Sequence, residues 1–442
     1  MPRDGRTDRT LESPLSATWR PAVREPAILV GIDPRGEESA LDELEALADS
    51  AGAEVVGRMV QRRDKPDATT FVGRGKLSDL HDVVHAQDAG LVVFDDELTP
   101  AQLRNVEERL KVKVIDRTAL ILDIFALHAR SREGKAQVEL AQLNYLVPRL
   151  RGWGEAMSRQ AGGIGTRFGG GETKLEIDRQ HIRRRIAKLR RDLTQLAKTR
   201  GVKRAERERS GIPQIALAGY TNAGKSTLMN ALTDADVVVA DQLFATLDPT
   251  VRRVKLPGGR AVTLSDTVGF VRKLPHQLVE AFRSTLEEVG EATILLHVVD
   301  AGQDPVKQID AVNTVLSELG VVGKPVVLAM NKVDVLDQEA RAHLERRYPD
   351  AVLCSAADGT GLDLLLDRLD RELSKLKVEV ELDIPFDRGE IVAQAYARGD
   401  VIEESHTERG THMIVRIPSE WMPDFGPFMS TPRPDVEPVD GA

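Results

Sequence analysis

The stretch GYTNAGKST, at 219–227, constrains the fold of this chain more than any other feature of the sequence. It fits the pattern G-x-x-x-x-G-K-[ST] and stands between the apolar run PQIALAG (213–219) and the helix-forming segment STLMNAL (226–232). A strand, a glycine-containing loop and a helix in this order are typical of a phosphate-binding loop in an α/β fold. Backbone N–H groups of the loop and the helix N-terminus attract phosphate oxygens, so we expect a bound nucleotide.

The side chains of this loop predict particular contacts with a nucleoside triphosphate and Mg²⁺. Lys225 is placed to reach the β- and γ-phosphates, and the Ser226 hydroxyl is placed to ligate Mg²⁺. Asn222 is a candidate ligand for K⁺ near the bridging oxygen; the alternative is that it only caps its own loop. The residues expected to contact the nucleotide are Gly219, Tyr220, Thr221, Asn222, Ala223, Gly224, Lys225, Ser226 and Thr227.

A second pair of motifs indicates that the nucleotide is GTP. NKVD (331–334) follows an apolar run, and CSA (354–356) ends another. Asp334 can accept hydrogen bonds from guanine N1–H and N2–H₂, a donor pair that adenine lacks. Asn331 can tie its loop to the phosphate loop, and the stem of Lys332 can lie over the base. The remaining expected contacts are in Cys354, Ser355 and Ala356, where a backbone N–H would meet guanine O6.

Two segments between these motifs are expected to sense the γ-phosphate. DTVG (266–269) follows a strand-forming run, and FATLDPT (244–250) precedes that run without a regular period. Thr246 is the expected Mg²⁺ ligand, with Thr250 as the weaker candidate, and Asp266 is expected in the outer coordination sphere of the metal. The further expected contacts are Phe244, Ala245, Thr267, Val268 and Gly269, whose N–H would face the γ-phosphate.

Hydrolysis is expected to be slow in the isolated protein. The residue after Gly269 is Phe270, where many small GTPases have a Gln that orients the attacking water. Because Phe cannot hydrogen-bond to water, we expect a partner to accelerate the reaction. The expected catalytic residues are Lys225, Thr246, Gly269 and Asn222.

Alternating strand and helix patterns predict two α/β units separated by helices. Short apolar runs alternate with helical spacings before residue 117 and again after residue 211, which favours parallel, doubly wound sheets. The predicted division is a disordered tail at 1–25, an N-terminal α/β domain at 26–117, a helical hairpin at 118–210, a GTPase domain at 211–376, a small α+β domain at 377–429 and a second disordered tail at 430–442.

The predicted hairpin is the basic part of an otherwise acidic chain. Residues 130–210 hold 21 Lys or Arg and 9 Asp or Glu, a charge of +12, and the whole chain carries −9. A glycine-rich tip at 151–171 joins two predicted helical runs, 118–150 and 173–203. Such a basic, exposed segment is a candidate for RNA binding; the alternative is a solvated helix that arginines keep soluble. The candidate contacts are Arg151, Arg159, Arg167, Arg183 and Arg184.

Cysteine usage and hydropathy exclude several other classes of protein. The single cysteine, Cys354, excludes a disulfide framework and a Cys-rich metal site, and it fits a reducing compartment. No stretch reaches the ~18 apolar residues that a bilayer span needs, and the polar N-terminus is unlike a signal peptide. We therefore expect a cytoplasmic protein without a membrane span that is monomeric in solution.

Beyond these motifs, long stretches of the chain resemble the HflX family of translational GTPases. The resemblance covers most of residues 26–428 and departs at RFGGGE (167–172), where the family usually has R-G-P-G-E. The segments that carry it, besides the nucleotide motifs, are FDDELTPAQLRNVEERL (94–110), DRTALILDIFALHARSREGKAQVELAQLNY (116–145), GGIG (162–165), ETKLEIDR (172–179) and DTVGFVRKLPHQLVEAFRSTLEE (266–288).

The resemblance implies a GTPase that binds the large (50S) ribosomal subunit and its rRNA, the hairpin inserting toward the peptidyl transferase region. It further implies dissociation of stalled or idle 70S ribosomes with ribosome-stimulated hydrolysis of GTP. The alternative is a GTPase switch that acts on another RNA or protein partner, such as a ribosome assembly or RNA-modification factor. A third hypothesis is an ATP-dependent activity at GRGK (73–76), although a turn before a helix is the simpler interpretation of that segment.

Overall fold

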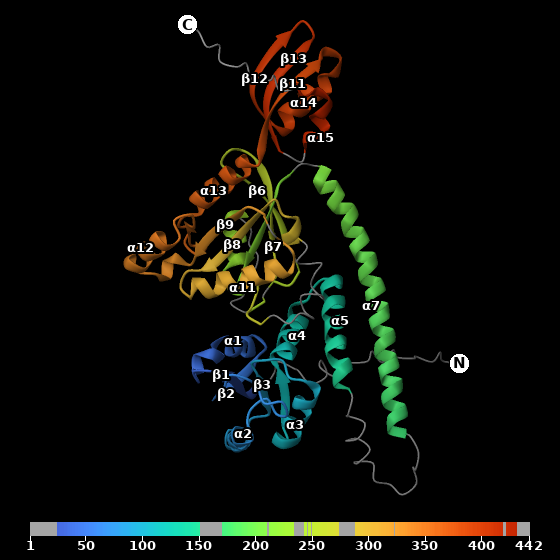
Figure 1. The fold of residues 1–442 in the computed structure, drawn as a ribbon, viewed down its shortest axis with the longest axis vertical. Coiled ribbons are helices and arrows are strands. Elements are labelled where there is room, and N and C mark those ends of the chain that lie inside the picture. Colours follow the sequence, from blue (N-terminus) through green and yellow to red (C-terminus); the bar gives the residue numbers. More distant parts are fainter. Residues whose placement is uncertain are drawn as a thin grey trace, which may run out of the picture.

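The computed structural model places three sheets one after another along the chain (Figure 1). It describes residues 24–150, 170–209, 212–233, 243–244, 246–248, 250–273, 288–321, 323–418 and 421–430. The predicted tails before residue 24 and after residue 430, and residues 151–169 of the tip predicted at 151–171, lie outside the described residues. Gly170 and Gly171 belong to a helix instead of the tip. Within the described ranges, no helix combines the length and the apolar character needed to cross a membrane.

The first sheet is parallel and has helices on both faces, as predicted. Its strand order is β2-β1-β3-β4. Alternate residues of β1 face opposite sides, so that Leu29 packs in one core cluster with α1, and Ile28 and Val30 pack in another with α2 and α3. The elements are β1 (Glu25–Asp33), α1 (Asp42–Ser50), β2 (Ala53–Arg62), α2 (Arg74–Ala86), β3 (Leu91–Phe94), α3 (Pro100–Leu110) and β4 (Lys113–Asp116).

The single helical run predicted for 118–150 is wrong, because the structure has two helices there. These are α4 (Arg117–His128) and α5 (Arg132–Arg149), with extended backbone at Ala129 and Ser131 between them. Ser131 caps α5, since its Oγ accepts a hydrogen bond from Gly134 N at 2.8 Å. Helix α4 is apolar and packs in the core of the first sheet, and α5 adds Val138, Ala141 and Tyr145 to the same core.

Helix α5 lies beside α7 (Gly170–Arg209), which leads back to the second sheet (Figure 1). Arg185 of α7 makes a two-pronged ion pair with Glu139 of α5, with N–O distances of 2.6 and 2.7 Å. Five large apolar side chains in the described part of α7 are buried or half-buried and recur at helical spacing, which is typical of a helix face that packs on a partner. They are Ile182, Ile186, Leu189, Leu193 and Leu196.

The second sheet carries the nucleotide motifs and is also covered on both faces, as predicted. Its order is β10-β9-β8-β5-β7-β6, with α8 and α13 on one face and α11 on the other. The elements are β5 (Gln214–Gly219), α8 (Lys225–Thr233), β6 (Thr250–Lys255), β7 (Ala261–Asp266), β8 (Ile294–Asp300), α11 (Pro305–Glu318), β9 (Val326–Asn331), α12 (Gln338–Arg347), β10 (Val352–Leu353) and α13 (Leu362–Lys375).

One strand of this sheet has no clear signal in the sequence. Strand β6 is an edge strand antiparallel to β7. Its sequence, TVRRVK, exposes Arg252 and Arg253 and buries only Val254 fully, so it lacks the apolar run of a central strand.

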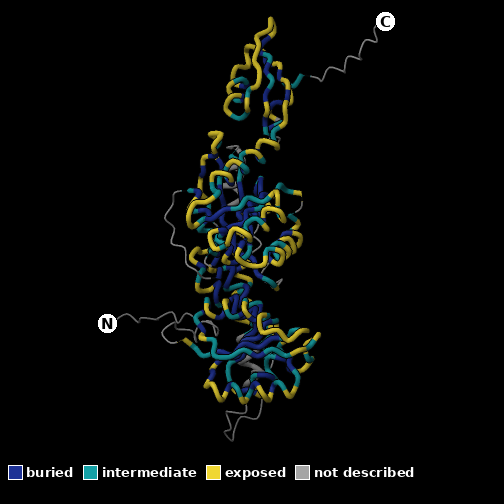
Figure 2. The backbone as a smooth tube through the Cα atoms, turned by 90° about the vertical axis from the view of Figure 1, so that its left-hand side faces the viewer, coloured by how far each residue is buried: buried dark blue, intermediate teal, exposed yellow. Residues whose placement is uncertain are grey.

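The third sheet is small and antiparallel, which confirms the predicted α+β unit. Its order is β11-β13-β12, and one face packs against α14 and the segment around α15. The elements are β11 (Lys377–Pro385), α14 (Gly389–Arg398), β12 (Asp400–Thr407), β13 (Gly410–Pro418) and α15 (Met422–Phe425). Strand β12 also lacks a sequence signal, because its residues, DVIEESHT, are almost all exposed. Figure 2 shows buried positions inside each of the three parts and exposed positions around them.

Candidate nucleotide-binding site

The predicted phosphate loop connects β5 to the first turn of α8. Asn222 and Gly224 have φ angles of 58° and 86°. A Cβ at Gly224 would lie 2.3 Å from Asn331 Nδ2. Both the positive φ angle and this steric clash therefore require glycine at the position. Asn331 donates through Nδ2 to Ala223 O at 2.9 Å and accepts through Oδ1 from Ala356 N at 3.0 Å. One side chain thus joins the phosphate, NKVD and CSA loops.

Lys225 lies inside this loop rather than on the surface. Its buried Nζ donates to Gly219 O at 3.1 Å and Tyr220 O at 2.7 Å. Burial lowers the pKa of Lys225 to about 8, although the charge of Asp266 opposes the shift. The Tyr220 side chain points elsewhere, since its hydroxyl accepts a hydrogen bond from Arg272 N at 3.0 Å.

The lowered pKa of Lys225 predicts proton uptake on nucleotide binding. Above pH 8 most of the free protein holds neutral Lys225. Phosphate oxygens favour the ammonium form, so binding should raise this pKa and take up a proton, and affinity should fall up to about tenfold per pH unit. Calorimetry of GDP binding at pH 8.6, in two buffers of different ionisation enthalpy, should show uptake of most of one proton. Lys225→Arg, whose guanidinium stays charged, should abolish the uptake; equal proton uptake in that variant would contradict the assignment.

Three oxygen atoms from three segments converge beside this lysine. Ser226 Oγ lies 2.6 Å from Asp266 Oδ2 and 2.8 Å from Thr246 Oγ1. Burial raises the pKa of Asp266, opposed mainly by Lys225, and its Oδ1 has no hydrogen-bond partner among the described residues. A buried carboxylate with a free oxygen beside two hydroxyls is a donor set that fits Mg²⁺. Thr246, and not Thr250, comes within hydrogen-bond distance of Ser226.

The other expected contacts after β7 turn their side chains away from the loop. Thr267 Oγ1 donates to Leu217 O at 2.6 Å, and Val268 packs in the core of the first sheet. Phe270 is buried against the α11 face of the second sheet, while its backbone pairs with the phosphate loop through Thr221 N→Phe270 O at 2.7 Å. The structure therefore leaves only the backbone of this segment facing the loop.

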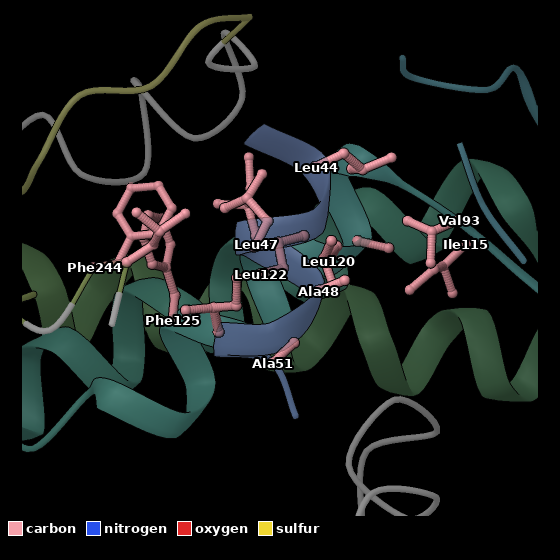
Figure 3. Close-up of a cluster of buried hydrophobic side chains, with 14 of the residues drawn as sticks. Leu44, Leu47, Ala48, Ala51, Val93, Ile115, Leu120, Leu122, Phe125 and Phe244 are labelled. Carbon is pink, nitrogen blue, oxygen red and sulfur yellow. The ribbon is translucent and has the colours of Figure 1, made fainter. Parts of the chain in front are cut away.

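The side chain of Phe244 packs away from the phosphate loop. Its ring packs edge-on against Phe125 of α4, with centroids 4.7 Å apart, inside the core of the first sheet (Figure 3). A nucleotide contact at Phe244 would therefore be made by its backbone, and it stays a prediction. Ala245 lies outside the described residues.

The loops expected to hold guanine follow β9 and β10. Asp334 is exposed, and Lys332, at φ 64°, places its Nζ 2.8 Å from Asp300 Oδ2. Asp300 does not stand out in the sequence, although it ends the apolar run ILLHVVD at the carboxyl edge of the sheet, where ligands bind in such folds. Cys354 is buried, which raises the pKa of its thiol to about 12.

The backbone amides of the CSA loop already have acceptors. Cys354 N donates to Met330 O and Ser355 N to Thr360 O, both at 2.8 Å. Ala356 N donates to Asn331 Oδ1 at 3.0 Å. All three amides therefore have acceptors within the chain, and the contact between a backbone N–H of this loop and guanine O6 stays a prediction.

An ion cluster that the sequence did not reveal joins this site to the first sheet. Arg117 is buried and donates to Asp95 at 2.8 Å, to Glu43, and to Arg272 O at 3.1 Å. Lys273 Nζ lies 2.9 Å from Asp95, and Arg272 Nε lies 3.3 Å from Glu43. No local pattern signals these pairs, because the partners are far apart in the chain.

The candidate RNA contacts are placed only in part. Arg183 and Arg184 lie on exposed positions of α7. Arg151, Arg159 and Arg167 lie outside the described residues. Among the described residues, no group of three or more His, Cys, Asp or Glu is arranged to hold a metal ion.

A doubly wound sheet with this phosphate loop and an Asn-Lys-x-Asp loop at its carboxyl edge defines a P-loop GTPase. Three family models match: "GTP-binding GTPase N-terminal" at 38–126, "GTP-binding GTPase Middle Region" at 128–207 and "50S ribosome-binding GTPase" at 214–332. The chain belongs to the HflX family of GTPases and is a GTP-hydrolysing enzyme that binds guanine nucleotides.

Two relatives show the extent of the similarity. GTPase HflX of Caldanaerobacter subterraneus subsp. tengcongensis is 49% identical over 400 residues, covering 90% of this chain and 92% of that protein. GTPase HflX of Escherichia coli K12 is 46% identical over 383 residues, covering 86% and 89%. Among solved structures, a GTP-binding protein from Sulfolobus solfataricus in complex with GDP is 27% identical, covers 78% of this chain and 98% of that one, and has a TM-score of 0.41.

Proposed function

We propose that this GTPase binds the large ribosomal subunit through its basic hairpin and dissociates stalled or idle 70S ribosomes in the cytoplasm. The observation that carries the proposal is α7, which holds 14 Lys or Arg against 6 Asp or Glu and runs along one side of the first two sheets (Figure 1). At 1.5 Å per residue, a helix of 40 residues is about 60 Å long. Such a rod can present positive charge to RNA phosphates along one side of the molecule.

In this proposal the site converts GTP and water to GDP and phosphate. Lys225 contacts the β- and γ-phosphates, Ser226 and Thr246 hold Mg²⁺ with Asp266 behind them, and the Gly269 N–H faces the γ-phosphate. Asp334, with Asn331 and Lys332, recognises guanine. When bound, Mg²⁺ neutralises charge that develops on the phosphate oxygens. The chain's own residues orient the triphosphate and exclude competing nucleotides.

Cosedimentation with purified large subunits tests the proposal. The protein should bind in the presence of a non-hydrolysable GTP analogue and bind less in GDP, and it should separate 70S ribosomes on a gradient with the same dependence. A protein that stays in the supernatant in both nucleotides would overturn the proposal and favour another RNA or protein partner.

The hairpin arginines should set the salt dependence of subunit binding. Replacing Arg151, Arg159 and Arg167 together by Ala should weaken binding and flatten the log–log salt slope by roughly 0.7 to 0.9 for each phosphate that an arginine no longer neutralises. The Arg183→Ala, Arg184→Ala double variant, on described positions of α7, should act in the same direction. GTP affinity of the free protein serves as the control and should not change. Wild-type affinity and slope in both variants would establish that the arginines only keep the helix soluble.

We further propose that Asn222 binds K⁺ beside the phosphates. Asn222 is exposed at φ 58°, a position from which its side-chain oxygen can reach a cation at the loop. Hydrolysis should then be faster in KCl than in NaCl at equal ionic strength, and Asn222→Ala should remove the difference. Equal rates in both salts would exclude this role and leave the phosphate loop itself unaffected.

A further inference from the structure

The segment that carries Thr246 is anchored to parts of the chain outside the GTPase sheet. Leu243 N donates to Ser50 Oγ of α1 at 3.0 Å, and the Phe244 ring packs on Phe125 of α4 (Figure 3). The Thr246 hydroxyl, two residues after Phe244, instead faces the phosphate loop and lies 2.8 Å from Ser226 Oγ. One short segment therefore contacts both the first sheet and the oxygen site.

Asp248 provides the anchor on the other side of Thr246. Its Oδ2 accepts hydrogen bonds from Arg130 N at 3.0 Å and Ser131 N at 2.6 Å, and its Oδ1 accepts one from Ser131 Oγ. These donors form the corner that begins α5, where a negative charge is favourable at a helix N-terminus. A Cβ at Gly134 would lie 2.5 Å from Asp248 Oδ1, so a glycine there allows the close approach.

The corner that Asp248 holds is the base of the basic hairpin. Helix α5 starts at this corner and pairs with α7 through the Glu139–Arg185 ion pair. The contacts are continuous from the oxygen site, through Asp248 and Ser131, to the helix that carries the arginines.

We propose that Asp248 is a positioning residue that couples occupancy of the γ-phosphate and Mg²⁺ site at Thr246 to the base of the hairpin. The inference rests on the proposed role of Thr246, and it deepens the proposed function by naming a residue that links the nucleotide site to the hairpin. Asp248 holds Thr246 in place for Mg²⁺, and bound GTP in turn holds the first turn of α5. Coupling of this kind is reciprocal, because each end must change the binding free energy of the other by the same amount.

Nucleotide titrations of the full chain without ribosomes test the coupling. Asp248→Ala should weaken binding of a Mg²⁺-bound, non-hydrolysable GTP analogue about tenfold, within the usual range of coupling between sites, and leave GDP affinity within about twofold. Asp304→Ala is the matched control, because Asp304 likewise accepts hydrogen bonds at a helix N-terminus, from Val306 N and Lys307 N of α11. It should change neither affinity. Equal weakening for both nucleotides, or no change, would overturn the proposal.

A second variant separates the coupling from simple loss of a cap. Gly134→Ala makes α5 a better helix former but displaces the Asp248 carboxylate, so it should reproduce the loss of analogue affinity. Amide exchange at 131–135 should slow when the analogue binds to the wild type, and not in either variant. Nucleotide-independent exchange in the wild type would contradict the coupling. Because no ribosome is present, these measurements can contradict the coupling without bearing on subunit binding, and cosedimentation can contradict subunit binding without bearing on the coupling.

Discussion

Asp334→Asn is expected to change the nucleotide preference from GTP to xanthosine triphosphate. Loss of two charge-assisted hydrogen bonds to guanine should cost about 3 kcal/mol, or roughly a 150-fold loss of GTP affinity. The new amide can donate to the C2 oxygen of xanthine, so the variant should bind that nucleotide more tightly than GTP. Because Asp334 is exposed, the substitution should leave the fold intact.

Competition binding with GTP, ATP and xanthosine triphosphate measures this change. Asp350→Asn, at another exposed position before β10, is the control and should keep the wild-type preference. Unchanged GTP affinity in Asp334→Asn would show that guanine is recognised elsewhere. That outcome would also remove the role proposed for the neighbouring Lys332, whose stem is expected to lie over the base.

Lys225→Ala is expected to abolish hydrolysis both with and without ribosomes. The ammonium group is held inside the phosphate loop at 2.7 Å from Tyr220 O, where it can meet charge that develops on the γ-phosphate. Loss of one such donor to a transition state costs about 10² to 10³ in kcat. Large subunits should raise the wild-type kcat by orders of magnitude, because Phe270 supplies no polar group, and should not rescue the variant.

Phosphate release at saturating GTP measures both rates. Lys255→Ala, which removes an exposed lysine at the end of β6, is the matched control and should hydrolyse GTP like the wild type. A Lys225→Ala protein with kcat within tenfold of the wild type would show that the loop lysine does not stabilise the transition state. A fast wild-type enzyme that does not respond to subunits would instead contradict the role given to Phe270.

Much of the fold could be predicted because its signals are local. Most strands of the first two sheets are short apolar runs, and their helices have regular apolar spacing, so periodicity predicts most of these elements. Strands β6 and β12 could not be predicted, because edge strands expose polar side chains at most positions and so lack an apolar run. The break between α4 and α5 could not be predicted either, because Ser131 is held by a hydrogen bond to Asp248, which is distant in the sequence.

The candidate site divides in the same way. The nucleotide motifs could be found in the sequence because binding of phosphate and guanine depends on a few neighbouring backbone and side-chain groups, such as the positive φ at Gly224. The sequence could not show that Phe244 packs on Phe125, or that the amides at 354–356 already have acceptors. These contacts form between segments that are distant in the sequence and meet only after folding.

The sequence by itself determined the chemistry that this protein can perform, because Lys225, Ser226, Asp266 and Asp334 are recognisable from their own short motifs. Only the tertiary structure decided what that chemistry is connected to. Arg117, Glu43 and Asp248 join the GTPase sheet to the first sheet and to the hairpin, and the residues next to them in the sequence do not indicate these partners. The physical reason is that such contacts are set by packing between distant segments, for which a single sequence has no periodic signal.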